Sequence, residues 1–155
     1  MTRFAWKTMV SWIVPALVVA VAGTVLAQEE QGSVVYREKI MRLTGTSMGA
    51  INDVLKFKLA AGAEHIAAHA ETIERQSRLI PGAFQPEELS DESRALPVIW
   101  QQWDEFVAAA AALGVASARL AEVAQGGDQR AIMAEVRSVG EACSNCHDTF
   151  RRPNE

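Results

Sequence analysis

The stretch Cys143-Ser144-Asn145-Cys146-His147 lies inside a regular apolar pattern near the end of the chain. Apolar residues recur there at alternating spacings of four and three, namely Ile132, Val136, Val139, Cys143, Cys146 and Phe150. This spacing predicts a helix with one buried face. Gly126-Gly127 and then Asp128 precede it, and these residue types end one helix and cap the next. Both cysteines therefore belong to the buried face of the predicted C-terminal helix.

The pentapeptide has the form C-x-x-C-H, which predicts covalent attachment of a c-type haem. Two thiols three residues apart can each add to a haem vinyl group, and the imidazole of His147 can bind the iron. Residues three and four apart share one face of a helix, so one flat ligand can meet all three side chains. A zinc site is a weaker interpretation, because zinc normally takes four protein ligands and the chain has only 2 cysteines.

Residues 1–27 have the layout of an export signal. Arg3 and Lys7 are their only charged residues, and a nearly uninterrupted apolar run follows. We expect cleavage after Ala27, which leaves residues 28–155 as one domain in the periplasm, outside the inner membrane, where c-type haem is attached. The alternative is an uncleaved leader that anchors the protein, because the uncharged stretch approaches the ~20 residues that span a bilayer.

The expected mature chain is acidic. Two of the 15 basic residues and none of the 19 acidic ones lie in the leader, so residues 28–155 carry 13 basic and 19 acidic residues, a formal charge of −6. The basic residues are scattered, which gives no indication of nucleic-acid binding. Net charge alone suggests a basic docking partner.

Residues 33–58 are predicted to form the first of four helices, with Ser33 as its N-cap. Two apolar stripes lie on nearly opposite sides of this helix. One consists of Val34, Met41, Met48 and Leu55, and the other of Tyr36, Ile40, Leu43, Ser47, Ala50 and Val54. One stripe can face the core. The other needs either more of the same core or another copy of the chain, so a homodimer through the first helix is one expectation.

The remaining segments complete an all-α chain. Residues 59–79 predict an alanine-rich helix that ends before Pro81-Gly82, and residues 81–97 form a long connection. Residues 97–125 carry a heptad pattern with Ser117 as its only polar member. Its members are Ile99, Trp103, Phe106, Ala110, Leu113, Ser117 and Leu120. Four helices without a convincing strand predict an antiparallel four-helix bundle with covalently attached haem in its core.

A four-helix chain with one C-x-x-C-H near its C-terminus resembles the class II c-type cytochromes, that is cytochrome c′ and its low-spin, methionine-ligated relatives. The likeness covers the whole mature chain. Besides the haem motif it rests on Tyr36-Arg37-x-x-x-Met41, Met48-Gly49-Ala50-Ile51, Leu96-Pro97-x-Ile99-Trp100 and Cys146-His147-Asp148-x-Phe150-Arg151.

The resemblance implies roles for individual residues. It makes Cys143 and Cys146 the thioether-bearing residues and His147 the proximal iron ligand. Arg37 and Glu38 match residues that line the haem edge, and Arg151 matches a basic residue beside the proximal imidazole. Met41 matches the position that faces the iron from the distal side.

The ligation of Met41 decides the expected function. If its thioether binds the iron, both axial positions are filled, and the protein is a one-electron carrier between periplasmic redox proteins. If Met41 only packs over an open site, the iron can bind a small gas such as nitric oxide. The pattern from Lys39 to Met48 resembles the methionine-ligated branch, which favours the carrier. An enzyme is not expected, because no acid or base stands out beside Met41.

Overall fold

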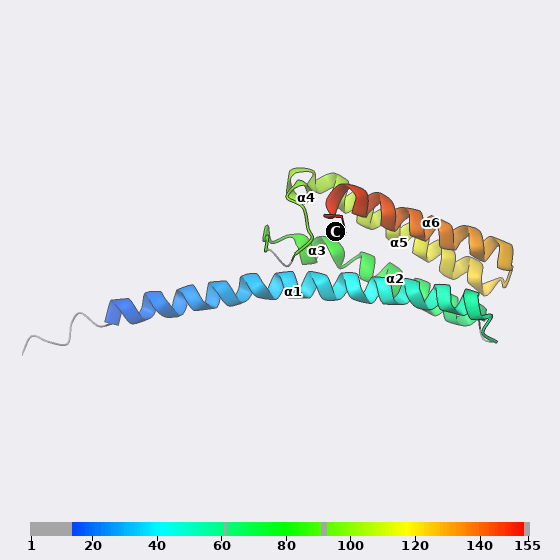
Figure 1. Ribbon diagram of the computed structural model, residues 1–155, viewed down its shortest axis with the longest axis horizontal. Coiled ribbons are helices and arrows are strands. Elements are labelled where there is room, and N and C mark those ends of the chain that lie inside the picture. The colour runs from blue at the N-terminus through cyan, green and yellow to red at the C-terminus, as the bar shows by residue number, and fades with distance from the viewer. Residues whose placement is uncertain (1–13, 61, 91–92, 154–155) are drawn as a thin grey trace, which may run out of the picture. The chain divides into compact units, whose positions relative to one another are not determined.

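The computed structural model describes residues 14–60, 62–90 and 93–153, with side chains from Gly32 onward. The described elements are α1 (Val14–Phe57), α2 (Gly62–Ser77), α3 (Ile80–Phe84), α4 (Val98–Gln101), α5 (Trp103–Gln125) and α6 (Gln129–Phe150) (Figure 1). The chain divides into two compact units, and the second begins at Ser33. All of the packing described below belongs to this second unit.

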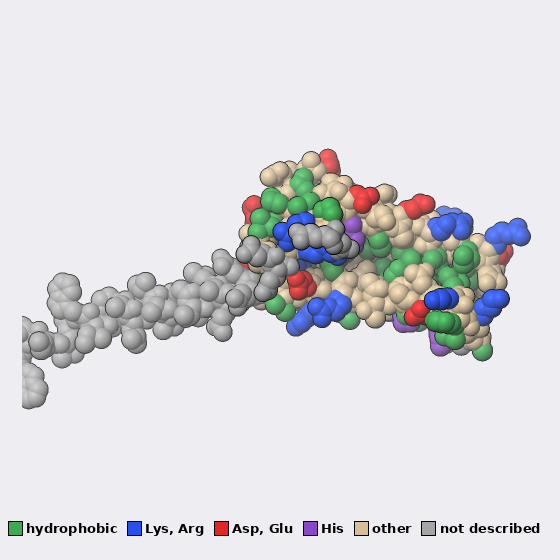
Figure 2. Space-filling model, viewed as in Figure 1, with side chains coloured by type: hydrophobic (Ala, Val, Ile, Leu, Met, Phe, Trp, Pro, Cys, Tyr) green, Lys and Arg blue, Asp and Glu red, His purple; other side chains and the backbone are tan. Residues whose placement is uncertain are grey.

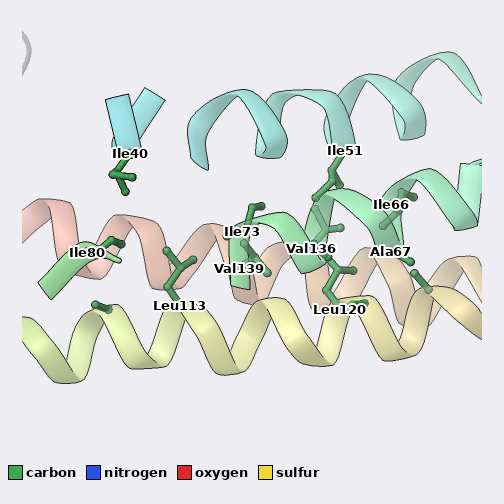
Figure 3. Close-up of a cluster of buried hydrophobic side chains, with 14 of the residues drawn as sticks. Ile40, Ile51, Ile66, Ala67, Ile73, Ile80, Leu113, Leu120, Val136 and Val139 are labelled. Carbon is green, nitrogen blue, oxygen red and sulfur yellow. The ribbon is translucent and has the colours of Figure 1, made fainter. Parts of the chain in front are cut away.

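The second unit is an antiparallel four-helix bundle, as predicted. It consists of the Ser33–Phe57 part of α1 together with α2, α5 and α6. Short connections join α1 to α2 and α5 to α6, so each pair forms an antiparallel hairpin. Figure 3 shows aliphatic side chains from all four helices converging on one core. Those labelled are Ile40, Ile51, Ile66, Ala67, Ile73, Ile80, Leu113, Leu120, Val136 and Val139.

The predicted helix start at Ser33 is wrong, because α1 begins at Val14 and runs through this residue. Pro15 lies in the first turn of α1, where a proline is tolerated, and no later proline interrupts the helix before Phe57. The Ser33 hydroxyl therefore caps nothing and bonds to the carboxylate of Glu88. Residues 1–13 of the predicted export signal lie outside the described residues.

The core-facing side of α1 also differs from the predicted stripes. Its buried residues follow one continuous pattern of three and four, namely Val34, Arg37, Ile40, Thr44, Ser47, Ile51 and Val54. Arg37 and Thr44 are polar, so a prediction based on apolar residues alone divided this one buried face between two stripes. Tyr36 and Leu43, assigned to a buried or partnered stripe, are 46% and 52% exposed.

The long connection between α2 and α5 is locally structured. The second helix ends at Ser77, before Pro81 as predicted. Pro81 itself lies in the first turn of the short helix α3, which follows after a turn at Arg78 and Leu79. The predicted third helix is interrupted, because Gln102 leaves the helical conformation at φ −122° and ψ 48° and separates α4 from α5. These breaks place the connection at one end of the bundle, beside the C-terminal end of α6 (Figure 1).

Helices α5 and α6 agree closely with their sequence patterns. Every member of the heptad is buried except Trp103, which is half-buried, and Ser117 is 0% exposed. Asp128 caps α6 by accepting hydrogen bonds from the backbone N–H groups of Arg130 and Ala131. Among the described helices α5 is long and apolar enough to cross a membrane, but its buried stripe packs against α2 and α6 as a core helix does.

Candidate haem-binding site

A cavity of about 490 Å³ opens between the first and last helices of the bundle. This volume is in the usual range for small-molecule and cofactor sites. The lining comes from five helices and the connection before α4. It consists of Arg37, Glu38, Met41, Arg42, Gly45, Phe84, Ser93, Arg94, Ala95, Ile99, Phe106, Cys146, His147, Phe150 and Arg151. Six of the seven residues predicted for the site are among these fifteen, and Cys143 is the exception.

The two cysteines occupy one face of α6, as the helical spacing predicts. Both are free thiols, both are half-buried, and both pack against the apolar core. Burial raises the pKa of the Cys143 thiol, and burial together with Cys143 raises the pKa of Cys146 to about 11. The thiols are therefore uncharged near neutral pH. A thioether does not titrate, so covalent attachment would leave no charge at this buried position.

His147 is held in the form that binds a metal. Burial lowers the pKa of its imidazole, and the positive charges of Arg151 and Arg94 lower it further, against an opposing effect of Asp148. The neutral imidazole keeps a lone pair for coordination. The backbone carbonyl of His147 accepts a hydrogen bond of 3.1 Å from the N–H of Arg151, which closes the end of α6.

Arg37 contributes a buried cation to the cavity. Its side chain is 2% exposed, and its guanidinium carbon lies 5.4 Å from the centre of the Phe84 ring and 5.8 Å from the Trp100 ring. One terminal nitrogen donates a hydrogen bond to the backbone carbonyl of Glu88. The other terminal nitrogen and Nε have no partner among the described residues. Buried donors of this kind are costly unless an acceptor satisfies them.

Aromatic rings form the inner wall of the cavity. Phe106 lies 5.1 Å from Phe84 and 5.3 Å from Phe150, measured between ring centroids, and the second pair is edge-to-face. The indole N–H of Trp100 donates a 2.8 Å hydrogen bond to the carbonyl of Phe84, which fixes the end of α3. Such pairs are more favourable than their buried area alone predicts. The inner wall of the cavity is therefore apolar and aromatic.

The chain after α6 is tied to the connection before α4. Leu96 donates its backbone N–H to the carbonyl of Phe150 at 3.1 Å, and Arg152 donates its own to the carbonyl of Arg94 at 2.8 Å. The guanidinium of Arg94 donates to the carbonyl of Arg152 at 2.6 Å. This antiparallel contact brings Arg94 and Ala95 beside Arg151, although more than fifty residues separate them in the sequence.

The residues present fit a covalently bound haem. An apolar, aromatic-walled cavity suits a flat hydrophobic macrocycle. Cys146 and a neutral His147 line it from α6, and Met41 lines the α1 side. The unpartnered donors of Arg37 are suited to a haem propionate, which would supply the missing acceptors.

Comparisons with known proteins agree with this fit. The family model described as Cytochrome C′ matches residues 33–151. Cytochrome c-556 of Agrobacterium tumefaciens is 34% identical over 120 residues, which cover 77% of this chain and 97% of that protein. Cytochrome c′ of Pararhodospirillum photometricum is 34% identical over 118 residues, which cover 75% of this chain and 93% of the relative.

Solved structures show the same fold. Cytochrome c prime from Shewanella frigidimarina aligns with a TM-score of 0.73 at 24% identity, covering 80% of this chain and 97% of that one. A nitric oxide complex of a cytochrome c prime variant from Alcaligenes xylosoxidans aligns with a TM-score of 0.70 at 27% identity, covering 80% and 97%. A four-helix bundle with this motif defines a class II c-type cytochrome. The chain belongs to the cytochrome c′ family, and it carries one covalently attached haem c.

Sequence reasoning missed much of the lining. Arg94 and Ala95 belong to the long connection, and only the hydrogen bonds to the end of the chain bring them to the cavity. Phe84 follows a Pro-Gly pair that indicated a loop rather than a wall. Phe106 was recognised as a core residue by its heptad position, and the same position makes it a wall of the cavity.

Proposed function

We propose that this protein is a monohaem one-electron carrier in the periplasm. In this proposal Cys143 and Cys146 hold the haem through thioethers, His147 is the proximal iron ligand, and Met41 is the distal one. The observation that carries the proposal is the pairing of Met41 on α1 with His147 on α6 in the lining of one cavity. A haem with His and Met as axial ligands exchanges electrons and leaves no coordination position for a substrate.

We choose Met41 as the distal ligand because of where the methionine side chains lie. Met41 is the only methionine in the lining, whereas Met48 is half-buried against the core and Met133 is 41% exposed. A thioether is a soft ligand that favours the reduced metal. Among the described residues, Glu38 is the one acidic side chain in the lining, and it is exposed. The described part of the lining therefore offers no buried carboxylate that could act as a catalytic acid or base. A carrier rather than an enzyme is therefore the function we propose.

The alternative is a gas-binding cytochrome with five-coordinate iron. It is favoured by the structural relatives, since structures of cytochrome c prime variants from Alcaligenes xylosoxidans contain bound nitric oxide or carbon monoxide. In that case Met41 packs over an open coordination site. Its half-buried side chain is compatible with this role, because methionine commonly fills irregular space beside apolar walls.

Optical spectra with a matched pair of variants separate the two functions. The carrier predicts a low-spin spectrum that carbon monoxide leaves unchanged in the reduced protein. Met41→Leu then gives a high-spin spectrum that changes fully on addition of carbon monoxide, while Met48→Leu behaves like the parent protein. A parent protein that is already high-spin and binds carbon monoxide identifies the gas binder. An acid-solvent wash that removes the colour rules out the thioethers.

We propose that residues 1–27 are an export signal that is cleaved after Ala27, which places the cytochrome in the periplasm. The composition of this segment and the need to attach haem outside the inner membrane support the proposal. Mass spectrometry of the purified holoprotein tests it. A mass that begins at Gln28 agrees with cleavage, and a full-length chain found in the membrane fraction identifies the uncleaved anchor.

We propose further that the exposed side of α1 forms a homodimer. Val35, Tyr36 and Leu43 are 46%, 46% and 52% exposed, so three large apolar side chains lie on one helix without a partner in the described part of the chain. Clustered exposed apolar residues commonly mark interfaces. The partners of the carrier are then a second copy of the chain and periplasmic redox proteins.

A further inference from the structure

We propose that the mouth of the haem cavity is a docking surface for an acidic face of a redox protein, although the chain as a whole is acidic. The inference rests on the proposed electron-carrier function and names its partner by charge. It concerns the arginine rim, which we define as Arg42, Arg94 and Arg151 around the buried Arg37.

The charge of the cavity lining is opposite to that of the chain. Four arginines line the cavity, and Glu38 is the one acidic residue in the lining. Within the lining, these four positive charges exceed the negative charge of Glu38 and of the two propionates that a haem would carry. Glu88 and Asp148, whose charges act on Arg37 and His147, lie outside the lining. Figure 2 shows Lys and Arg side chains gathered beside a histidine on the face in view.

Among the described residues, which exclude Asp91 and Glu92, no arginine of the rim forms an ion pair. Ion pairs in the described part of the chain include Arg75–Glu71, Arg78–Glu74 and Arg119–Glu135. None of them includes an arginine of the cavity. The guanidinium of Arg94 donates to the backbone carbonyl of Arg152, which is a neutral acceptor, and Arg42 is exposed. The positive charge is therefore available to a partner.

Local charge decides docking at physiological salt. Charges separated by more than a Debye length, about 8 Å at 0.15 M, are largely screened from each other. A partner that approaches the cavity meets the arginine rim, while the acidic residues on the distant sides of the bundle contribute little. Electron transfer requires close approach of two cofactors, so productive docking takes place at the mouth of the haem cavity. The net charge of residues 28–155 gives the wrong sign for this surface.

The test uses small redox reagents of opposite charge with the reduced holoprotein. Each turnover passes one electron from the haem iron to hexacyanoferrate(III), which becomes hexacyanoferrate(II), or to tris(phenanthroline)cobalt(III), which becomes the cobalt(II) complex. Stopped-flow rates are measured from low to high ionic strength. We expect the rate with the anionic hexacyanoferrate to fall several-fold as salt rises and the rate with the cationic cobalt complex to rise. The net charge of the chain predicts the reverse for both reagents.

A matched pair of double variants locates the effect. The rim double variant carries Arg42→Gln and Arg94→Gln. The control double variant carries Arg75→Gln and Arg119→Gln, and it changes the net charge by the same amount away from the cavity. We expect the rim double variant to remove most of the salt dependence with hexacyanoferrate and the control to retain it. Arg42→Gln alone serves as a second rim variant, because no side-chain hydrogen bond of Arg42 is lost. Calorimetric titration with hexaglutamate is an independent readout, and it should show binding that only the rim variants weaken.

The opposite outcomes overturn the proposal. A rate with hexacyanoferrate that rises with salt, or equal behaviour of the two double variants, shows that the arginine rim does not steer a partner. This failure is distinct from failure of the carrier proposal. The latter appears as carbon monoxide binding in the optical spectrum, whereas the salt dependence is measured with small reagents whichever axial ligand the iron has.

Discussion

At the residue scale, Arg37 illustrates how a charged side chain becomes part of a core. A lone arginine on a predicted helix is normally solvated, because its charge is costly to bury. Here the guanidinium is enclosed between Phe84 and Trp100, one of its nitrogens bonds to the Glu88 carbonyl, and the coulombic effects of Glu88 and Glu38 only partly offset the lowering of its pKa by burial. A cofactor carboxylate at the same place would complete its hydrogen bonds.

Replacement of this cation is expected to lower the reduction potential. A buried positive charge favours the reduced, less positive iron, so Arg37→Gln should lower the midpoint potential by about 50 mV, corresponding to an electrostatic effect on the order of 1 kcal/mol. Potentiometric titration of the holoprotein measures the change. Arg75→Gln is the control, because Arg75 is exposed and pairs with Glu71. Equal potentials in both variants would place Arg37 outside the electrostatic reach of the iron.

At the element scale, the contact between α2 and α5 depends on a glycine. A Cβ atom built at Gly114 lies 2.6 Å from the hydroxyl oxygen of Ser77, which is 3% exposed and donates to the carbonyl of Glu74 at 2.8 Å. Two helices can approach so closely only where one of them lacks a side chain. Gly114 therefore lowers the helix propensity of α5 but permits the close packing of α5 against α2.

The contact predicts a coupled pair of substitutions. Gly114→Ala should destabilise the protein by about 1 kcal/mol, because overpacking outweighs the gain in helix propensity. Adding Ser77→Ala should restore most of the lost stability by removing the clashing oxygen. Denaturant unfolding of the holoprotein measures both. Gly49→Ala is the control, because nothing lies within 4 Å of its added Cβ. Equal changes in stability for Gly114→Ala and Gly49→Ala would show that Ser77 moves aside without cost.

At the scale of the whole molecule, the bundle leaves large apolar side chains of α1 exposed in the described part of the chain. The core takes one face of α1, and the outer face keeps Tyr36 and Leu43 exposed. Together with the arginine rim this gives the molecule two distinct surfaces, an apolar one suited to another copy and a charged one beside the haem cavity.

The assembly is tested by charge placed on the outer face. Leu43→Glu is expected to convert the proposed dimer into a monomer, because the two copies would each bury a carboxylate without a partner. Sedimentation of the holoprotein gives the mass of the assembly. Val115→Glu is the control, since Val115 is 71% exposed on α5 and should remain dimeric with this change. A monomeric parent protein, or a dimer that survives Leu43→Glu, contradicts the proposal.

The sequence predicted the parts of this molecule that depend on local spacing. The four-three pattern placed Cys143, Cys146 and Phe150 on one face of α6, and the heptad of α5 placed Ser117 in the core. Asp128 was identified as a cap because its chemistry suits the start of a helix. The predictions for helix boundaries were wrong where a residue type occurs both inside and outside helices. Ser33 lies within a helix, and Pro81, which was assigned to the connection, lies in the first turn of α3.

The sequence by itself determined a helical bundle with a haem motif on its last helix, because helical periodicity and the C-x-x-C-H spacing are properties of neighbouring residues. The tertiary structure alone decided which distant residues surround that motif. Arg94 reaches the cavity through hydrogen bonds to the chain end, and Arg37 is buried by aromatic rings from two other helices. Such contacts are set by packing between elements, which no local pattern records, and they bring Arg37 and Arg94 to the haem site of an acidic chain.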